Sequence, residues 1–586
     1  MGTRPIIERV PRSFSMNYSM FQLPLLRRDM SYSYGYKPSL TEKPSFWIGL
    51  VIGIIVVIVG IIWFFVGVMY DSTAIAIREL IAFWNAGLFP NGWNIFLATP
   101  FFWTMVVVIA IIAVWIWAFY DDNLDLRFIT ASVITVVLLV GVVGYDIWKG
   151  VVYNNNGAGH YLTTTSFVVK DTAKLPSMLT KQSQNGNLTV EIEQGDLPTS
   201  WTPRVASATG ALRVMELTSE AVNNTELMAE TMTYLYGEGD NGVWTAIRDG
   251  NNQQSIYGVS SWNGTGDNVE TCRFEGDYKI DKAYGGLWGK NLTNAVAGKY
   301  PSFNYNESDM WGYCEGDQPI IVVPGVTLSG IDVRTTDQSA GVVTIKGSTG
   351  GEPVITLLTD VKAGDFPGPV YAQRLVDQQR DALDWSAGYW ASVNEHFGFE
   401  VTNVESQSGN NSNYLMKSEE DGRLYWVTPL KPQSAKSQTL IAYSVTPADE
   451  VSAPVLNHQA VYVLNEDDER VVNLDDMLAR VTDTVRDQYP GFFTGKNPGT
   501  IAEFLPVSDT QWQVFAEVSG RVKFRIDVNV NARITPKVIN VDTGEEVEPS
   551  DPDQVVTCDD PSSLSDSQLA ACLVLLSGEL QTRQSE

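Results

Sequence analysis

Histidine and basic side chains are scarce in this 586-residue chain. It has 3 histidines, 4 cysteines and 40 lysines and arginines against 68 acidic residues, for a formal net charge of −28. Affinity for nucleic acid rests on clustered lysine and arginine, so the balance of charge excludes a nucleic-acid partner. The histidines are scattered singly and no CxxC pair occurs, which leaves no pattern for a metal site or a bound cofactor.

Motifs of catalysis are missing as well. The chain has no P-loop, GxSxG, HExxH or EF-hand pattern. A site built on a Ser-His or Cys-His pair would have to include His160, His396 or His458. Acid pairs such as Glu419 and Glu420, and the acidic run 466–469, lack ligand spacing and are typical of solvated turns. The sequence therefore favours a protein without catalysis, although paired carboxylates of a glycosidase cannot be recognised without distances.

Charged residues are also absent from three long apolar runs in the first quarter of the chain. Residues 46–70 carry no charge over 25 positions, and Pro100–Tyr120 and Phe128–Tyr145 are equally free of charge. At about 1.5 Å per residue, runs of this length can cross a hydrocarbon core of roughly 30 Å as helices. We therefore expect a multi-pass α-helical anchor of three transmembrane helices over residues 45–149, with the lipid bilayer as a partner.

The flanks of these runs indicate an orientation. Seven basic residues precede the first run, whereas Arg78 and Arg127 are the only ones in the two loops that follow. Basic residues beside a span tend to stay in the cytoplasm. We expect residues 1–44 to be a cytoplasmic tail, the first run to be an uncleaved signal anchor, and everything after Lys149 to be extracytoplasmic.

Small residues mark a candidate packing stripe in the first run, at Gly49, Gly53, Gly60 and Gly67. Another helix backbone can approach such a stripe closely. Packing within the anchor and formation of a homo-oligomer both satisfy it. The interfacial segment 72–97 is interrupted by Pro90 and Gly92, which predicts an amphipathic helix at the outer surface or a re-entrant loop lining a pore.

The four cysteines, Cys272, Cys314, Cys558 and Cys572, all lie in the part expected outside. An even number confined to an exported region predicts disulfide bonds. The simplest pairing joins Cys272 to Cys314 and Cys558 to Cys572, while other pairings stay open.

The region after the anchor divides into parts with different patterns of apolar and polar residues. Residues 150–365 show short alternating runs broken by Asn, Gly and Asp, which predicts a mainly β ectodomain. Residues 366–547 mix helical and strand patterns, which predicts an α+β ectodomain, and 548–586 form a linker and a short helix.

Two patterns in the α+β region are clear. Asn473 caps a helical pattern that ends before Pro490. RVKFRIDVNV, from Arg521, alternates strictly between apolar and polar residues, as in a strand of a sheet with one wet face. The unit made of this helix and the strands after it ends in ARITPKVINVDTGEEV. It resembles in outline the helix-plus-sheet PepSY module, and the resemblance rests on no specific motif.

Together these patterns predict a membrane protein that presents a large acidic extracytoplasmic region for binding or assembly. Beyond residue 149 the chain has 30 basic and 59 acidic side chains. Its expected partners are an extracytoplasmic protein or glycan and further copies of itself. Alternatives are an enzyme acting on cell-envelope polymers, a channel or transporter subunit, and an envelope protein of a virus or mobile element.

Overall fold

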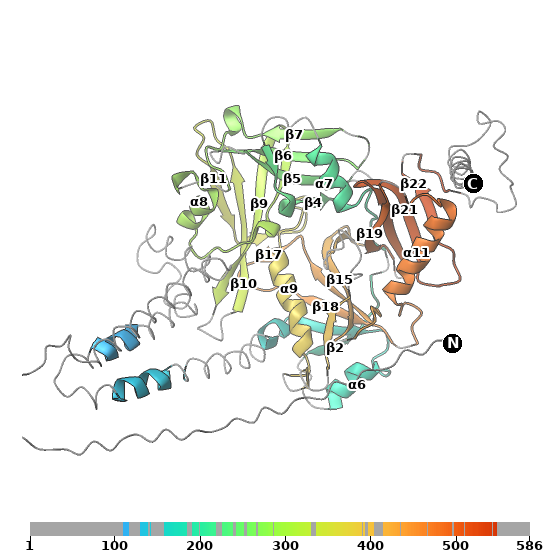
Figure 1. Cartoon of the computed structure of the whole chain (residues 1–586), viewed down its shortest axis with the longest axis horizontal. Helices are drawn as coiled ribbons and strands as arrows, with labels where there is room; N and C mark the ends of the chain where they lie inside the picture. The colour runs from blue at the N-terminus through green and yellow to red at the C-terminus, as the bar shows by residue number, and fades with distance from the viewer. Residues whose placement is uncertain are drawn as a thin grey trace, which may run out of the picture. The chain divides into compact units, whose positions relative to one another are not determined.

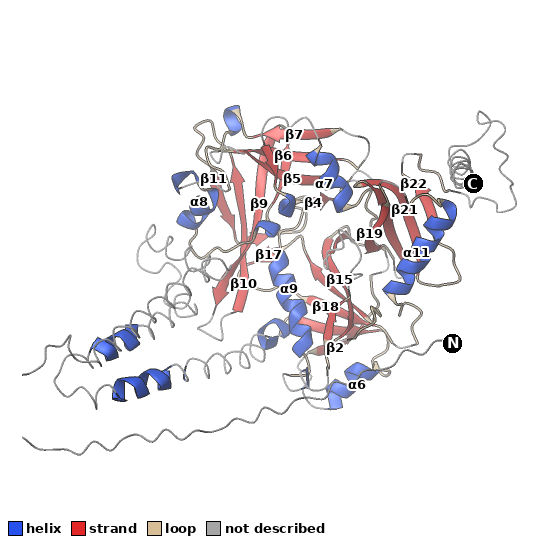
Figure 2. Ribbon diagram, in the orientation of Figure 1, coloured by secondary structure: helices blue, strands red, loops and turns tan. Residues whose placement is uncertain are grey.

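The computed structural model describes residues 109–116, 129–138, 141 and most of 158–547. Within the last range it leaves out 185–189, 199, 218–224, 238–241, 251–254, 265, 267, 285, 287, 330–335, 389–390, 393–395, 403–413, 434, 466, 495–496, 509 and 542. Strands dominate this part of the chain (Figure 1, Figure 2), which confirms the β-rich character expected from the sequence.

The largest sheet has seven strands and mixed direction. Its order is β13-β15-β16-β18-β1-β2, with β14 also paired to β15. Strand β1 is parallel to both of its neighbours, and the other pairs are antiparallel. The strands are β1 (Thr165–Val169), β2 (Glu191–Gln194), β13 (Phe399–Val401), β14 (Tyr414–Lys417), β15 (Leu424–Pro432), β16 (Ala442–Pro447) and β18 (Gln459–Val463).

Two antiparallel sheets are built from the chain between β2 and β13. One has the order β3-β5-β6-β7 with β4 also on β5, and the other has the order β11-β10-β9-β8. Their strands are β3 (Thr225–Leu227), β4 (Thr233–Leu235), β5 (Val243–Gly250), β6 (Ile256–Trp262), β7 (Val269–Arg273), β8 (Trp311–Glu315), β9 (Gln318–Ser329), β10 (Thr336–Lys346) and β11 (Val354–Leu358). A small pair, β12 (Asp360–Val361) and β17 (Val451–Ser452), is separate.

The last sheet is the antiparallel meander β19-β20-β21-β22, covered on one face by α11 (Leu474–Gln488) (Figure 1). Its strands are β19 (Gly499–Pro506), β20 (Gln511–Val518), β21 (Arg521–Asn529) and β22 (Lys537–Asn540). The side chain of Asn473 accepts a hydrogen bond from the Asp475 amide, so the predicted cap is confirmed. In β21, Phe524, Ile526 and Val528 are buried and alternate with more exposed residues, as the sequence pattern predicts.

Shorter helices connect the sheets. The α-helices are α6 (Ser177–Gln184), α7 (Ala208–Glu216), α8 (Leu292–Lys299) and α9 (Gln373–Asp381). The 3-10 turns are η3 (Ala229–Thr231), η4 (Gly276–Tyr278), η5 (Trp288–Lys290), η6 (Glu307–Asp309) and η8 (Ala382–Trp385). Helix α9 buries Leu375 and Val376 in a core shared by the seven-stranded sheet and by β8–β10, because apolar residues of all three meet there.

The membrane part of the predicted fold class is wrong. In the portion of the chain that the structure describes, no helix is long and apolar enough to cross a membrane. The described parts of the second and third apolar runs, 109–116 and 129–138, are helical. Freedom from charge is not sufficient, because a crossing also needs about 20 consecutive helical residues. The first run, 46–70, and the segment 72–97 lie outside the described residues.

The predicted domain boundaries stay a prediction. The seven-stranded sheet takes β1 and β2 from the region expected to be mainly β, and its other strands from the region expected to be α+β.

Candidate functional site

The start of helix α7 carries the first group of buried polar residues. Ser207 has an extended backbone, and its hydroxyl oxygen accepts a hydrogen bond from the Gly210 amide at 3.0 Å, which makes it the N-cap. The same hydroxyl donates to the carboxylate of Glu517, and the amide of Ala208 donates to Oε1 of Glu503 at 2.6 Å. Glu503 and Glu517, which come from the β19–β22 sheet, thus accept hydrogen bonds at the N-terminus of α7, the positive end of the helix dipole.

Both carboxylates come from irregularities in the strands. The β19–β20 register shifts between Ala502 and Phe504, and the β20–β21 register shifts between Ala516 and Glu517. Glu503 has a φ of 47°, a left-handed conformation that side chains with a Cβ rarely adopt. Such bulges re-aim a side chain out of the alternating pattern, and here they direct Glu503 and Glu517 toward α7.

Arg204 lies at the centre of this group. Its backbone exchanges two hydrogen bonds with the side chain of Gln513, at 3.0 and 2.8 Å, and its Nη2 donates to the Leu415 carbonyl at 2.9 Å. Nη1 is 3.7 Å from Oε2 of Glu503, close enough for charge attraction but too far for a hydrogen bond. The guanidinium carbon is 5.3 Å from the ring centre of Trp244 and 5.7 Å from that of Tyr234, within cation–π range.

Burial sets the electrostatics of these carboxyl groups. Glu503 is 1% exposed, and burial raises its pKa to about 7 despite the lowering effects of Arg204 and of the Ala208 amide. Burial also raises the pKa of Glu517, although its hydrogen bond from Ser207 lowers it. Burial would lower the pKa of Arg204, but Tyr236 and Glu503 outweigh it, so the guanidinium stays charged.

A third buried carboxyl group lies at Asp309, at the end of η6. Asp309 and Asn306 form a capping box, in which the Asn306 amide donates to Oδ2 of Asp309 at 3.3 Å. Burial raises the pKa of Asp309 to about 6, while backbone amides of Asn306, Arg374 and Gln373 lower it. Gln373 and Arg374 begin α9, so this acid also faces a helix N-terminus.

A cavity of about 540 Å³ brings Arg204, Glu503 and Asp309 together. Residues of η3, η6, α9 and several strands line it, and Glu230 at its margin is exposed. Its aromatic lining consists of Tyr234, Trp244, Trp311, Tyr371, Tyr414 and Trp426. A concave site with aromatic walls and a few convergent polar groups is the usual form of a ligand pocket.

No protein-family model, curated protein or solved structure matches this chain. The outline resemblance to the PepSY module therefore gains no support, and the cavity has to be interpreted from its own residues.

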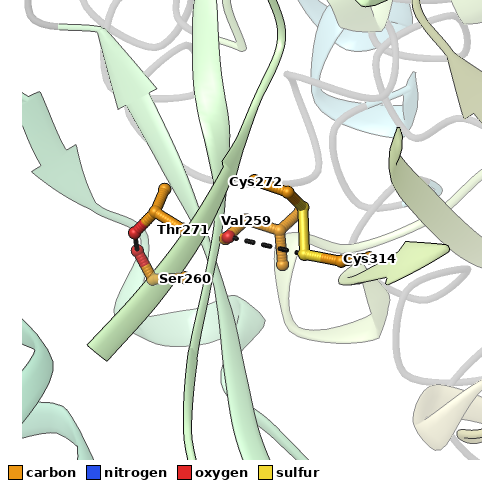
Figure 3. Close-up of a disulfide and its surroundings, with 5 residues drawn as sticks. All are labelled: Val259, Ser260, Thr271, Cys272 and Cys314. Atoms are coloured by element: carbon orange, nitrogen blue, oxygen red, sulfur yellow. Dashed lines mark hydrogen bonds between the residues drawn. A yellow bond between two sulfur atoms is a disulfide. The ribbon is translucent and has the colours of Figure 1, made fainter. Parts of the chain in front are cut away.

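The predicted cysteine pair lies away from this cavity. Cys272 of β7 and Cys314 of β8 form a disulfide with a Cα–Cα distance of 6.1 Å (Figure 3), the pairing that the sequence favours. The bond joins two different sheets, and Sγ of Cys314 lies 3.9 Å from the Val259 carbonyl oxygen. The disulfide lines a second cavity of about 560 Å³ whose other lining residues include Glu270, Asp277 and Asp317.

The other predicted site residues lie outside the described part of the chain. These are the second cysteine pair, Cys558 and Cys572, and the glycine stripe Gly49, Gly53, Gly60 and Gly67. Their pairing and packing stay predictions.

The histidines do not form a catalytic group with either cavity. His458 lies 3.0 Å from the Ser166 hydroxyl through Nε2, but Ser166 is 1% exposed and lines neither cavity. Nε2 of His160 is buried without a hydrogen bond, and burial lowers the pKa of this side chain. His396 has a φ of 55° and likewise lies outside the lining of both.

The acidic pairs singled out in the sequence lie in turns. The Glu419 amide donates to the Ser200 carbonyl, and Asp468 pairs with Arg470 at 2.6 Å. Neither group lines the cavity at Arg204, Asp309 and Glu503. Among the described residues, no group of three or more His, Cys, Asp or Glu side chains is placed to hold a metal ion.

The residues that matter most here were not identified from sequence. Glu503 gives one usable signal, because it is a lone charge in the apolar strand segment IAEFLPV. Asp309 and Arg204 give none, since Asp309 follows polar turn residues and Arg204 follows a proline. Their approach depends on contacts between strands that are far apart in the chain.

Proposed function

We propose that residues 158–547 form an extracytoplasmic ligand-binding module and that the cavity at Arg204, Asp309 and Glu503 is its binding site. The observation that carries this proposal is a set of buried polar atoms without hydrogen bonds in the described chain: Nε of Arg204, Oδ1 of Asp309 and Oε2 of Glu503. All three residues line the same cavity. Unsatisfied buried polar atoms are costly and rare in native folds, and their concentration in residues around one cavity marks it as the candidate binding site.

The aromatic lining supports binding further. Trp244, Trp311 and Trp426 each donate their indole N–H to a backbone carbonyl, those of Ala206, Pro369 and Tyr371 respectively. Their polar atoms are therefore already paired. Trp244 and Trp311 are almost fully buried and shape the wall, whereas Trp426 is half-buried and offers apolar ring surface to a ligand. A pocket of this composition suits a small organic molecule, or one residue of a protein or glycan partner.

The Cys272–Cys314 disulfide supports the extracytoplasmic location. Disulfide bonds form and persist in oxidising compartments and are rare in the cytosol. The bond ties β7 to β8, the strand that begins with the cavity-lining residue Trp311.

The proposal is tested by blocking the cavity. Ala229 is exposed and lines the cavity, whereas Ala173 is also exposed and does not line it, so Ala229→Trp and Ala173→Trp form a matched pair. The full-length protein and both variants are screened by thermal unfolding with alkylammonium salts, carboxylates, neutral sugars and short peptides. We expect at least one class to raise the midpoint of the original protein and of Ala173→Trp, but not of Ala229→Trp.

Two outcomes contradict the proposal. Either no ligand class stabilises the original protein, or the class that does so stabilises Ala229→Trp equally.

A further inference from the structure

The Cys272–Cys314 disulfide lies in the wall of the second cavity. Both cysteines are half-buried, and both line this cavity of about 560 Å³. Val259, whose carbonyl oxygen lies 3.9 Å from Sγ of Cys314, is fully buried and does not line it (Figure 3). We therefore expect a reagent to approach the bond from the cavity and not from the side of Val259.

The wall of this cavity is acidic. Its charged residues are all exposed, and they are Arg273, Glu270, Glu275, Asp277 and Asp317. Four acids against one arginine give the described wall a net charge of −3. Two nearby lysines pair with other acids, Lys279 with Asp281 at 2.8 Å and Lys346 with Glu315 at 3.6 Å, and neither lysine lines the cavity.

Reduction of a disulfide is sensitive to such charge, because the attacking species is a thiolate. The thiolate attacks one sulfur, forms a mixed disulfide with it and releases the other cysteine as a thiolate. A second thiol equivalent then breaks the mixed disulfide, so two thiols supply the two electrons and leave as one oxidised reagent. Carboxylates within a Debye length, about 8 Å at physiological salt, repel both the incoming and the released thiolate.

The charge on the rest of the reagent changes this repulsion. An ammonium group on the thiol is attracted by the carboxylates and offsets the repulsion of its thiolate. A carboxylate on the thiol adds to the repulsion. Reagents of the two kinds should therefore differ in rate at this bond more than they do at a disulfide without charged neighbours.

We propose that the second cavity is a thiol-exchange site that accepts positively charged thiols and rejects anionic ones. The disulfide supplies the reacting atoms, and the acids of the wall select the reagent. Exchange at this site breaks the covalent link between β7 and β8, which belong to different sheets. The inference does not depend on the proposed function, because no described residue lines both cavities.

The test compares cysteamine, which carries an ammonium group, with 3-mercaptopropionate, which carries a carboxylate. The folded full-length protein is treated with each thiol, quenched in acid and alkylated, and peptide mass spectrometry follows the reduction of Cys272 and Cys314. Each rate is expressed per thiolate and divided by the rate of the same thiol on bis(2-hydroxyethyl) disulfide, which removes differences in intrinsic reactivity. We expect cysteamine to be faster by about five-fold or more at low salt, and this preference to shrink in about 1 M salt, where the Debye length is about 3 Å.

A matched pair of variants separates the wall from the overall charge of the chain. Glu270→Gln/Asp317→Asn removes two acids of the wall, whereas Glu226→Gln/Asp360→Asn removes two exposed acids that do not line the cavity. Both variants change the net charge by the same amount. We expect the wall variant to lose most of the preference for cysteamine and the control variant to keep it.

Three outcomes would overturn the inference. The first is an equal normalised rate for the two thiols at low salt, and the second is an equal preference in the wall and control variants. The third is a bond that neither thiol reduces while the protein stays folded, because the disulfide would then not be reachable from the cavity.

Discussion

At the scale of the residue, the burial of Asp309 makes the stability of the fold depend on pH. Its pKa is about 6 in the folded chain against an ordinary 3.8, because burial disfavours its charged form. The folded chain therefore holds this proton more tightly than the unfolded chain does. The contribution to stability is most favourable below about pH 4 and declines as the pH rises to about 6, above which a constant penalty remains.

Replacing Asp309 with Asn is expected to remove this penalty. The two pKa values differ by about 2 units, which corresponds to roughly 3 kcal/mol of unfolding free energy at pH 8 and almost none at pH 4. Urea unfolding of both proteins at the two pH values measures it. A variant that is less stable than the original at pH 8 would show that the charge of Asp309 is compensated in the fold.

At the scale of the element, helix α7 begins with a residue that has two tasks. Ser207 accepts from the Gly210 amide and donates to Glu517, a carboxylate that is 1% exposed. Ser207→Ala loses the cap, worth about 1 kcal/mol, and leaves a buried acceptor unpaired at a cost of roughly 1–3 kcal/mol more. We expect amide hydrogen exchange in Ala208–Glu216 to rise accordingly.

The N-cap of α8 gives the comparison. Asn291 accepts from the Asn294 amide at 2.7 Å and donates through Nδ2 to the Tyr284 carbonyl at 3.2 Å, but within the described chain it forms no hydrogen bond to a carboxylate. Asn291→Ala is therefore expected to lose the cap and one hydrogen bond to a carbonyl, without leaving a buried carboxylate unpaired. Equal losses in the two variants would mean that Glu517 gains nothing from Ser207.

Sequence periodicity predicted the elements with one apolar face, and it did so for a physical reason. Strand β21 and helix α11 each bury one face. The buried residues therefore recur every second position in β21, as at Phe524 and Ile526, and every three or four positions in α11, as at Val481. The cavity has no such signature, because the Arg204 amide and the Gln513 side chain that holds it are 309 residues apart. The left-handed backbone at Glu503 also follows from a bulge, which depends on the neighbouring strand.

The apolar runs show the limit of the same reasoning. Lack of charge over Pro100–Tyr120 is compatible with a crossing, and the described part of that run, 109–116, is helical. Trp115 donates its indole N–H to the hydroxyl of Thr135 at 3.2 Å, so the helices over 109–116 and 129–138 contact each other. Hydropathy counts the apolar residues in a run and does not report the contacts that a helix in that run makes.

At the scale of the whole molecule, the disulfide reports the compartment. Cells that produce a Cys558→Ser/Cys572→Ser variant are quenched in acid, and the protein is treated with a polyethylene-glycol maleimide before and after reduction. We expect Cys272 and Cys314 to react only after reduction, because the bond between β7 and β8 forms in an oxidising compartment. Reaction before reduction would place the chain in a reducing compartment and contradict the extracytoplasmic location.

The parallel pairing of β1 with β18 has a consequence for the order of folding. Thr165 pairs with Gln459, and the five residues of β1 are all buried. During synthesis β1 emerges long before its partner, so the largest sheet cannot close until the chain has been made as far as Val463. Contacts between such distant segments slow folding, and apolar strands that wait for a partner are prone to aggregate. A chaperone that holds the nascent chain until β18 emerges would therefore matter more for this protein than for one built from hairpins alone.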